Sequence, residues 1–258
     1  MAYEQELKCA LEAAKEAMTF IMSVYKKGFE VEIKSDNSPV TEADIGADKL
    51  IREILHKAFP KYAFLTEESK DDKIRLTNDY VWIVDPVDGT NDFVAKDGEF
   101  TTNIALAYKH QIVLGVVGVP VSGDIYYASK GDGAYLIRDH MTQKIHVNNK
   151  TKDLLALISR THNTKKVDDA LKSSAKISQI KCVGSSLKAC LIAEGRAEVY
   201  LKYDDMTKEW DTAAFQGVLE EAGGFVLKHN GEPITYNRDD VYNRGGFICV
   251  NLKENIVG

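Results

Sequence analysis

The sequence predicts a mixed α/β protein (α+β) of two lobes, and three patterns along the chain support this. Two segments near the N-terminus have helical periodicity, residues 80–136 form short apolar runs, and strand-like and helical segments alternate after about residue 150. A chain of 258 residues is long enough for two lobes that share an interface. We expect an N-terminal lobe of residues 1–150 and a C-terminal lobe of residues 151–258.

The first two elements are predicted to be amphipathic helices. Apolar residues recur in alternating steps of four and three on one face of the first helix, and they are Leu7, Leu11, Ala14, Met18, Ile21 and Tyr25. Gly28 is predicted to end this helix. Thr41 can cap a second helix that runs to about Phe59. Its predicted buried side comprises Ile45, Ile51, Leu55 and Ala58.

Strand patterns follow in both lobes. Between Tyr80 and Leu136, turn-forming residues separate the runs VWIV, NIALAY, IVLGVVGV, DIYYAS and GAYLI, which indicates a mostly antiparallel sheet. In the second lobe, the runs LLALIS, IKCV, AEVYL, GFVLK and GFICVN alternate with helical stretches near 165–173, 184–194 and 211–222. No repeat or flexible linker separates the lobes, so we expect a packed junction with a site between them.

Composition excludes several classes of partner. The net charge is -6 and the positive charges are scattered, which argues against a nucleic-acid polymer as the partner. No stretch approaches the roughly 18 apolar residues of a transmembrane segment, and the acidic N-terminus lacks a leader pattern, so we expect a cytoplasmic protein. The sequence carries no signal for an oligomeric state. Its widely spaced cysteines indicate reduced thiols rather than a zinc site, and they are Cys9, Cys182, Cys190 and Cys249.

The segment VWIVDPVDGTNDF is the richest in candidate chemistry. A buried apolar strand, Val81–Val84, leads to Asp85, and Asp88 follows three residues later. Two carboxylates and a backbone carbonyl can therefore converge at the end of a strand. Hard oxygen ligands of this kind suit Mg²⁺, whereas the six histidines show no ligand pair for zinc. Gly89 and Thr90 come next, and their backbone amides can point at a phosphate.

Each acidic motif also has a purely structural explanation. DPVDGT fits an ordinary turn. Glu67 and Glu68 in TEES follow the apolar run KYAFL, but glutamates at such a place are usually solvated. Asp44 lies three residues after Thr41 and can close a helix N-terminus, and Asp211 in EWDTAAF can do the same for a later helix.

Taken together and in order, the motifs TEAD, TEES, DPVDGTNDF and WDTAAFQGVLEEAGG resemble the signatures of the inositol monophosphatase superfamily of Mg²⁺-dependent, Li⁺-sensitive phosphatases. The segments SPVTEAD, DGEFTTNIAL, SRTH, GSSLKACLIAEGRAEVY and EWDTAA are similar to its CysQ branch, the 3′(2′),5′-bisphosphate nucleotidases, over nearly the whole chain. The resemblance implies a layered α/β/α/β/α sandwich.

The resemblance also implies a role for individual residues. The implied ligands of two or three Mg²⁺ ions are Glu67, Asp85, the Val87 carbonyl, Asp88 and Asp211. The implied catalytic residues are Asp44, Glu67 and Thr90, with Asp44 and Thr90 managing the attacking water. The implied substrate contacts are Gly89, Thr90, His162, Ser185, Lys188 and Asp211. Among the contacts, Lys188 would give the retained 5′-phosphate a counter-charge. Structural alternatives are a helix cap for Ser185, a solvated helix position for Lys188 and a loop histidine for His162.

The implied reaction is hydrolysis of 3′(2′)-phosphoadenosine 5′-phosphate to AMP and phosphate, with 3′-phosphoadenosine 5′-phosphosulfate as a further expected substrate. Inositol monophosphatase or fructose-1,6-bisphosphatase activity is the enzymatic alternative, because the superfamily shares the metal motifs. A nucleotide sensor without turnover is the non-enzymatic alternative. Phe215, where many members have Gly, and the acid-rich YDDMTKE segment leave the fine substrate preference open.

Overall fold

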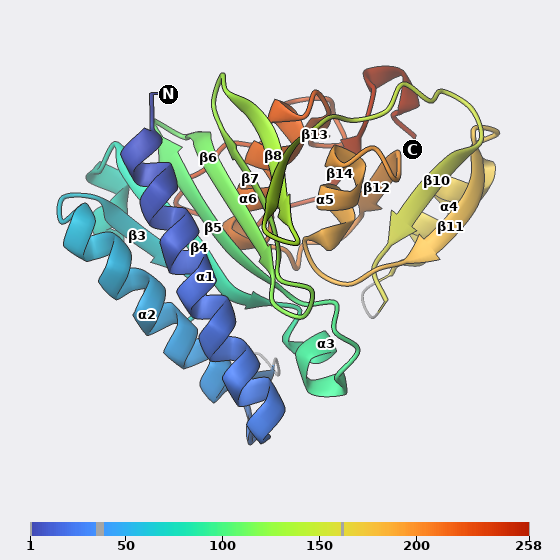
Figure 1. The fold of residues 1–258 in the computed structure, drawn as a ribbon. Coiled ribbons are helices and arrows are strands. Elements are labelled where there is room, and N and C mark those ends of the chain that lie inside the picture. Colours follow the sequence, from blue (N-terminus) through green and yellow to red (C-terminus); the bar gives the residue numbers. More distant parts are fainter. Residues whose placement is uncertain (1, 35–38, 161–162, 258) are drawn as a thin grey trace.

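The computed structural model describes residues 2–34, 39–160 and 163–257, and its elements stack in five layers (Figure 1). Two helices, a large sheet, two further helices, a smaller sheet and an outer helix follow one another across the molecule. This arrangement confirms the expected α/β/α/β/α sandwich. The helices are α1 (Glu4–Lys27), α2 (Glu42–Ala58), α3 (Thr90–Ala95), α4 (Lys165–Ser173), α5 (Leu187–Ala193) and α6 (Glu209–Glu221).

The larger sheet is antiparallel except where β3 runs parallel to β4, as the short apolar runs predict. Its strands, in spatial order, are β3 (Ala63–Thr66), β4 (Tyr80–Asp88), β5 (Thr101–Tyr108), β6 (Gln111–Val119), β7 (Asp124–Ser129), β8 (Gly133–Arg138) and β9 (Met141–Ile145). Strand β9 was not predicted, because four of its five residues are exposed at the sheet edge and form no apolar run. Strand β4 also extends further than expected and includes both Asp85 and Asp88, with an irregular register between them.

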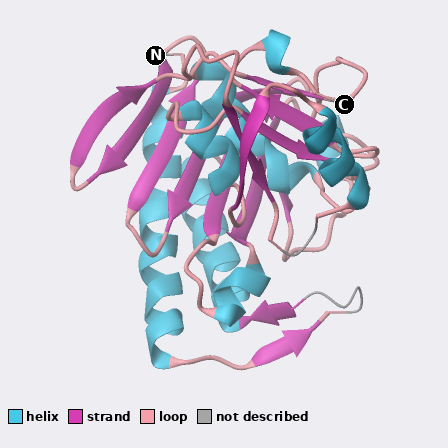
Figure 2. Ribbon diagram, turned by 90° about the vertical axis from the view of Figure 1, so that its right-hand side faces the viewer, coloured by secondary structure: helices cyan, strands magenta, loops and turns pink. Residues whose placement is uncertain are grey.

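The smaller sheet contains the strand runs of the second half of the chain. Its strands, in spatial order, are β11 (Ile177–Cys182), β10 (Leu154–Ile158), β12 (Val199–Lys202), β14 (Phe247–Val250) and β13 (Phe225–Leu227). A separate two-stranded hairpin pairs β1 (Val31–Ile33) with β2 (Pro39–Thr41), and it lies beside the lower ends of the long helices in Figure 2. Short 3₁₀ turns cover Ile74–Thr77 and Lys253–Asn255.

Helices α1 and α2 cover the outer face of the larger sheet. The predicted face of α1 is confirmed, and Gly28 ends the helix with a φ of 95°. The predicted buried face of α2 is partly wrong, because Ala58 is exposed and Ile45 is 56% exposed. Its buried residues are Ala43, Asp44, Ala47, Asp48, Ile51 and Leu55. Apolar periodicity could not identify a face composed mainly of alanines and aspartates.

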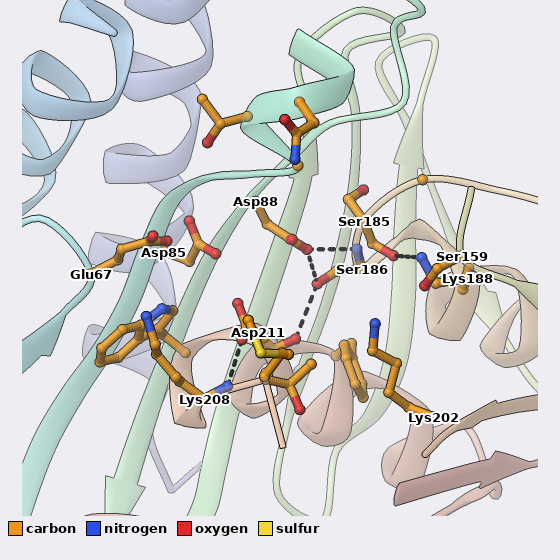
Figure 3. A pocket seen from close by; sticks show the side chains of 18 of the residues that line it. Glu67, Asp85, Asp88, Ser159, Ser185, Ser186, Lys188, Lys202, Lys208 and Asp211 are labelled. Atoms are coloured by element: carbon orange, nitrogen blue, oxygen red, sulfur yellow. Dashed lines mark hydrogen bonds between the residues drawn. The ribbon is translucent and has the colours of Figure 1, made fainter. Parts of the chain in front are cut away.

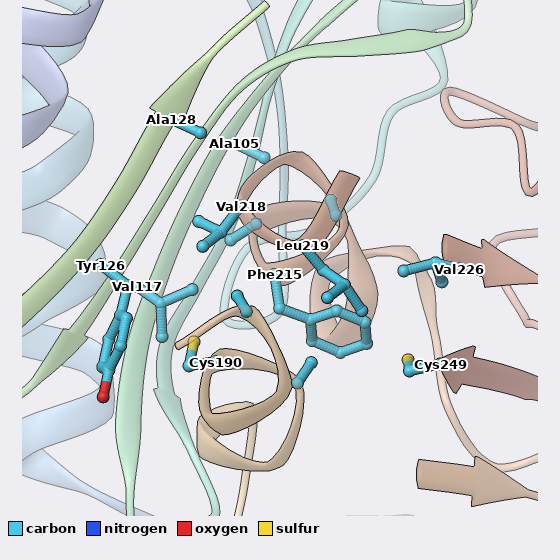
Figure 4. Close-up of a cluster of buried hydrophobic side chains, with 14 of the residues drawn as sticks. Ala105, Val117, Tyr126, Ala128, Cys190, Phe215, Val218, Leu219, Val226 and Cys249 are labelled. Carbon is cyan, nitrogen blue, oxygen red and sulfur yellow. The ribbon is translucent and has the colours of Figure 1, made fainter. Parts of the chain in front are cut away.

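Helix α6 packs between the two sheets and joins them in one hydrophobic core. In Figure 4, Val218 lies on the side of the larger sheet and Leu219 faces the smaller one. Gly115 of β6 allows this close packing, because a Cβ atom there would lie 2.2 Å from the Ala214 carbonyl oxygen. Since this core contains residues from both predicted lobes, the division near residue 150 stays a prediction.

Candidate active site

A cleft with a volume of about 590 Å³ lies where β4 ends and α6 begins. The predicted site residues that line it are Glu67, Asp85, Val87, Asp88, Gly89, Thr90, Ser185, Lys188 and Asp211. Asp44 lies next to this set and accepts a hydrogen bond from the Thr90 hydroxyl. His162, the remaining predicted contact, lies outside the described residues. The fold therefore brings together every predicted site residue that it describes.

Three carboxylates form the centre of the site (Figure 3). Oxygen atoms of Asp85, Asp88 and Asp211 lie within 4.8 Å of one another, close enough to hold a common metal ion. Strand β4 supplies the first two, and the first turn of α6 supplies the third. Glu67 follows β3, and its backbone N–H donates to the Val84 carbonyl at 3.2 Å, which places it beside the cluster.

Burial and mutual repulsion disfavour the ionised form of these acids. Removal from water raises the pKa of Asp85 well above its usual value, and the charges of Glu67, Asp88 and Asp211 add to the shift. Burial likewise raises the pKa of Asp211 to about 8, with further contributions from Asp88 and Glu67. A cation at the cluster would remove this repulsion, so the donor set fits a divalent metal ion.

The orientation of Asp88 depends on residues that the sequence did not reveal. Its Oδ2 atom accepts hydrogen bonds from the Ser186 backbone N–H at 2.7 Å and the Ser186 hydroxyl at 2.6 Å. The Asn103 side chain donates to the same oxygen at 3.3 Å and to the Ser186 hydroxyl at 2.8 Å. The segments TTN and GSS were visible signals, but only the fold shows that Ser186 and Asn103 meet at Asp88.

Asp44 closes the N-terminus of α2 and also contacts Thr90. Its Oδ2 accepts from the Thr41 backbone N–H at 2.8 Å and from the Thr41 hydroxyl at 2.7 Å, which closes the N-terminus of α2. Its Oδ1 accepts from the Thr90 hydroxyl at 3.1 Å, and the same hydroxyl lies 3.2 Å from the Val87 carbonyl. Burial raises the pKa of Asp44, while hydrogen bonds from Thr41 and Thr90 oppose that shift.

Gly89 shapes the turn between β4 and α3. Its φ of 90° lies in the left-handed region that favours glycine. A Cβ atom at this position would lie 3.2 Å from the Asp92 Oδ2 atom and 3.3 Å from the Ser185 Cβ atom. DPVDGT is therefore not an ordinary turn, because Asp85–Asp88 end strand β4 and only Gly89 separates them from α3. The chain at Gly89 lies tightly against the bend at Ser185 and Ser186.

The structural alternatives considered for Ser185 and Lys188 are both wrong. Lys188 is only 3% exposed, so the solvated alternative is wrong. Its ammonium donates to the Val183 carbonyl at 3.0 Å and to the Ser185 carbonyl at 2.7 Å. The residue before α5 is Ser186, not Ser185, so Ser185 does not cap that helix. Among the described residues, the Ser185 hydroxyl oxygen has no hydrogen-bond partner.

A further lysine, Lys34, contacts the acidic end of the site and was not predicted. Its ammonium lies 3.1 Å from a Glu67 carboxylate oxygen and 2.6 Å from a Glu68 oxygen. Burial raises the pKa of Glu68 to about 7, although Lys34 favours its ionised form. Lys34 therefore provides positive charge next to a predicted metal ligand.

Comparison with known proteins assigns the family. The family model described as the inositol monophosphatase family matches residues 2–257, almost the whole chain. The chain belongs to the inositol monophosphatase family. The resemblance in the acidic motifs is thereby confirmed, and the chain is an enzyme of the phosphatase type. Members of this family are generally metal-dependent, in agreement with the carboxylate cluster at Asp85, Asp88 and Asp211.

The CysQ branch is supported by relatives and by a solved structure. The 3′(2′),5′-bisphosphate nucleotidase CysQ of Escherichia coli K12 is 37% identical over 237 residues, which cover 91% of this chain and 95% of that protein. The CysQ protein of Aggregatibacter actinomycetemcomitans is 32% identical over 246 residues, 94% of this chain and 91% of the relative. The crystal structure of CysQ from Bacteroides thetaiotaomicron is 34% identical with a TM-score of 0.84, covering 97% and 99% of the two chains.

None of the helices in the described residues is long and apolar enough to cross a lipid bilayer.

Proposed function

We propose that this chain is a Mg²⁺-dependent 3′(2′),5′-bisphosphate nucleotidase that hydrolyses 3′-phosphoadenosine 5′-phosphate to AMP and phosphate. The observation that carries this proposal is a single cleft with buried carboxylates at one end and buried lysines at the other. Such a cleft offers separate places for metal ions with a reacting phosphate and for a second anionic group. The CysQ relatives support the same reaction. We place the enzyme in the cytoplasm.

The metal ligands are assigned by the chemistry of their donor atoms. Every donor at the acidic end is a carboxylate or carbonyl oxygen, which suits Mg²⁺. We propose two or three ions, the first held by Glu67, Asp85 and the Val87 carbonyl, and the second by Asp85, Asp88 and Asp211. Bound Mg²⁺ would polarise the phosphate and lower the pKa of a coordinated water.

The protein's own groups would activate and position the reactants. The Thr90 hydroxyl, 3.1 Å from Asp44 Oδ1, would accept a proton from the attacking water and pass its own proton to that carboxylate. The backbone at Gly89 and Thr90 would bind the scissile phosphate where α3 begins. Ser186 would keep the Asp88 carboxylate in a fixed orientation during the reaction.

Other groups would hold the nucleotide. The Ser185 hydroxyl lies in the lining of the cleft and provides a hydrogen-bonding group for the substrate. We propose that Asp211 contacts both metal and substrate, and that His162 contacts the nucleotide. We also propose that residues 1–150 and 151–258 act as two lobes, with the second supplying Asp211, Ser185 and Lys188.

A panel of substrates tests this function against the alternatives. Phosphate release would be measured from 3′-phosphoadenosine 5′-phosphate, inositol 1-phosphate and fructose 1,6-bisphosphate, each with Mg²⁺, with EDTA and with added Li⁺. We expect Mg²⁺-dependent release with a strong preference for the nucleotide. Preference for inositol or sugar phosphate would contradict the proposed branch, and absence of release from all three would favour the nucleotide sensor.

A further inference from the structure

Several polar side chains form a connected hydrogen-bond network next to the first turn of α6. They are Arg75, Glu209, Asn237, Arg238 and Asn243, and all except Arg238 are at most 4% exposed. Burial of such groups costs free energy unless each one finds its partners, so their arrangement is fixed within narrow limits. The proposed mechanism gives none of these five residues a role.

Glu209 joins the start of α6 to the loop that follows Tyr236. Its Oε2 atom accepts from the Asn237 backbone N–H at 2.6 Å, and its Oε1 atom accepts from the Arg238 backbone N–H at 2.8 Å. The Arg238 guanidinium also donates to Oε1 at 3.1 Å. Both carboxylate oxygens are therefore bound to this loop, two residues before Asp211 in the same helix.

Asn243 fixes the residue that orients the Asp211 carboxylate. The Lys208 backbone N–H donates to Asp211 Oδ2 at 2.5 Å (Figure 3). Asn243 donates to the Lys208 carbonyl at 2.8 Å, and the Arg238 guanidinium donates to the Asn243 side-chain oxygen at 2.8 Å. The position of Asp211 therefore depends on the loop of residues 237–243.

Arg75 connects the same loop to the larger sheet. It is 1% exposed and lies in the short 3₁₀ turn that follows Glu67 and precedes β4. Its guanidinium donates to the Asn237 side-chain oxygen and to the Arg238 carbonyl, both at 2.9 Å. The Asn237 side-chain amide donates back to the Arg75 carbonyl at 3.0 Å. We call this path from Arg75 through Asn237 and Arg238 to Glu209 the α6 bridge.

The carboxylates of the metal site repel one another, and the α6 bridge opposes their separation. Asp85 and Asp88 belong to β4, and Asp211 belongs to α6, with oxygen atoms within 4.8 Å of one another. Repulsion between these like charges favours movement of the first turn of α6 away from β4. The bridge joins that turn to the segment before β4, so it resists this movement. Ligands that are already in place bind an ion more tightly than ligands that the ion must bring together.

We infer that Glu209 and Arg75 are positioning residues that hold Asp211 against Glu67 and Asp85, so that the site is preorganised for Mg²⁺. This inference rests on the proposed metal site and is independent of the nucleotide. A protein with a broken bridge keeps every metal ligand but should bind Mg²⁺ more weakly, because the ion must then draw the first turn of α6 back towards β4.

The test measures Mg²⁺ affinity by calorimetry in the wild-type protein, Glu209→Gln and Arg75→Met. We expect both variants to bind Mg²⁺ about tenfold more weakly, the range for groups that orient metal ligands. The two substitutions change the charge in opposite directions. Loss of the Arg75 cation, which also leaves Asp71 unpaired, would by charge alone strengthen Mg²⁺ binding. Weaker binding in both variants therefore identifies an effect of geometry.

An uncharged variant serves if Arg75→Met fails to fold in a thermal unfolding scan. Asn237→Gly removes both side-chain contacts to Arg75, and glycine suits the φ of 55° at this position. It should also weaken Mg²⁺ binding, although it leaves the net charge unchanged.

Glu194→Gln is the matched control, because it breaks a 2.8 Å ion pair with Arg138 and removes the same charge as Glu209→Gln. It should lower Tm and leave Mg²⁺ affinity unchanged. Tighter Mg²⁺ binding in Arg75→Met, wild-type affinity in the bridge variants, or an equal loss in Glu194→Gln overturns the inference. A wild-type protein that binds no Mg²⁺ overturns the proposed metal site, and the inference with it.

Discussion

The two ends of the cleft both contain buried charges, but the fold compensates them differently. At the acidic end, Asp85, Asp88 and Asp211 lie close together and their repulsion favours a bound cation. At the other end, the Lys188 ammonium donates to backbone carbonyls and the Lys202 ammonium pairs with Asp204. The groups around a buried charge therefore decide whether it marks a binding site for an ion.

The largest effect should follow from damage to the acidic end. Asp88→Asn keeps an oxygen that can accept from Ser186 but removes a negative charge, so Mg²⁺ affinity should fall. We expect kcat to fall about 1,000-fold, since the charge that develops on the phosphate loses its main stabilisation. Mg²⁺ titration of activity measures both changes. Glu53→Gln, an exposed carboxylate on α2, is the control, and an Asp88→Asn enzyme with wild-type Mg²⁺ dependence and rate would contradict the metal assignment.

A smaller loss should follow when the acidic end keeps its metal ligands but loses its proton path. Thr90→Val removes the hydroxyl that bonds to Asp44. We expect kcat to fall roughly 100-fold with little change in KM, the range of lost acid–base catalysis. Steady-state kinetics would show this, and Thr90→Ser should restore most of the rate. A valine variant with a normal kcat would show that the pair does not act on the attacking water.

Alanine variants of two adjacent serines distinguish a residue that orients a metal ligand from one that contacts the substrate. Ser186→Ala removes a donor from Asp88 and should weaken Mg²⁺ affinity about tenfold, as expected for a group that orients a ligand. Ser185→Ala leaves Asp88 untouched and should change KM for the nucleotide rather than Mg²⁺ affinity. Calorimetric Mg²⁺ titration of the two variants gives the comparison. Equal effects on Mg²⁺ affinity would show that the hydroxyl contact to Asp88 has no role in metal binding.

The smallest effect concerns stability and pH. The pKa of Asp211 is about 8 in the folded, metal-free protein and near 3.8 when unfolded, so the folded state binds more protons between these values. The stabilisation that this group contributes is present below pH 3.8 and is lost as pH rises through 8. Excess Mg²⁺ should therefore raise Tm by a few degrees more at pH 8 than at pH 6. Thermal unfolding scans at the two pH values measure this difference. If Asp211→Asn shows the same difference between pH 8 and pH 6 as the wild-type protein, the titration of Asp211 is not its cause.

Much of the fold followed from periodicity, and its failures have physical reasons. Helical periodicity predicted α1 because this helix buries one apolar face. Short apolar runs predicted the antiparallel strands because these strands are buried in the larger sheet. The buried face of α2 was misjudged at Ile45, since the fold buries Asp44 and Asp48 instead. The polar edge strand β9 has no apolar pattern that could have predicted it.

The site was predictable only where its residues stand in compact motifs. Asp85 and Asp88 lie in one short segment whose turn chemistry and charge are visible in the sequence. The contact between Ser186 and Asp88 joins residues 98 positions apart, and that between Asn103 and Ser186 joins residues 83 apart.

Anomalous diffraction from crystals grown with Mn²⁺ and AMP, the proposed product, would test the division of the cleft most directly. Mn²⁺ replaces Mg²⁺ at oxygen ligands and is located by its own signal. The account predicts Mn²⁺ peaks among Asp85, Asp88 and Asp211, with the 5′-phosphate of AMP bound in the same cleft away from these carboxylates. Metal peaks away from the three carboxylates, or a 5′-phosphate bound directly at the metal cluster, would contradict it.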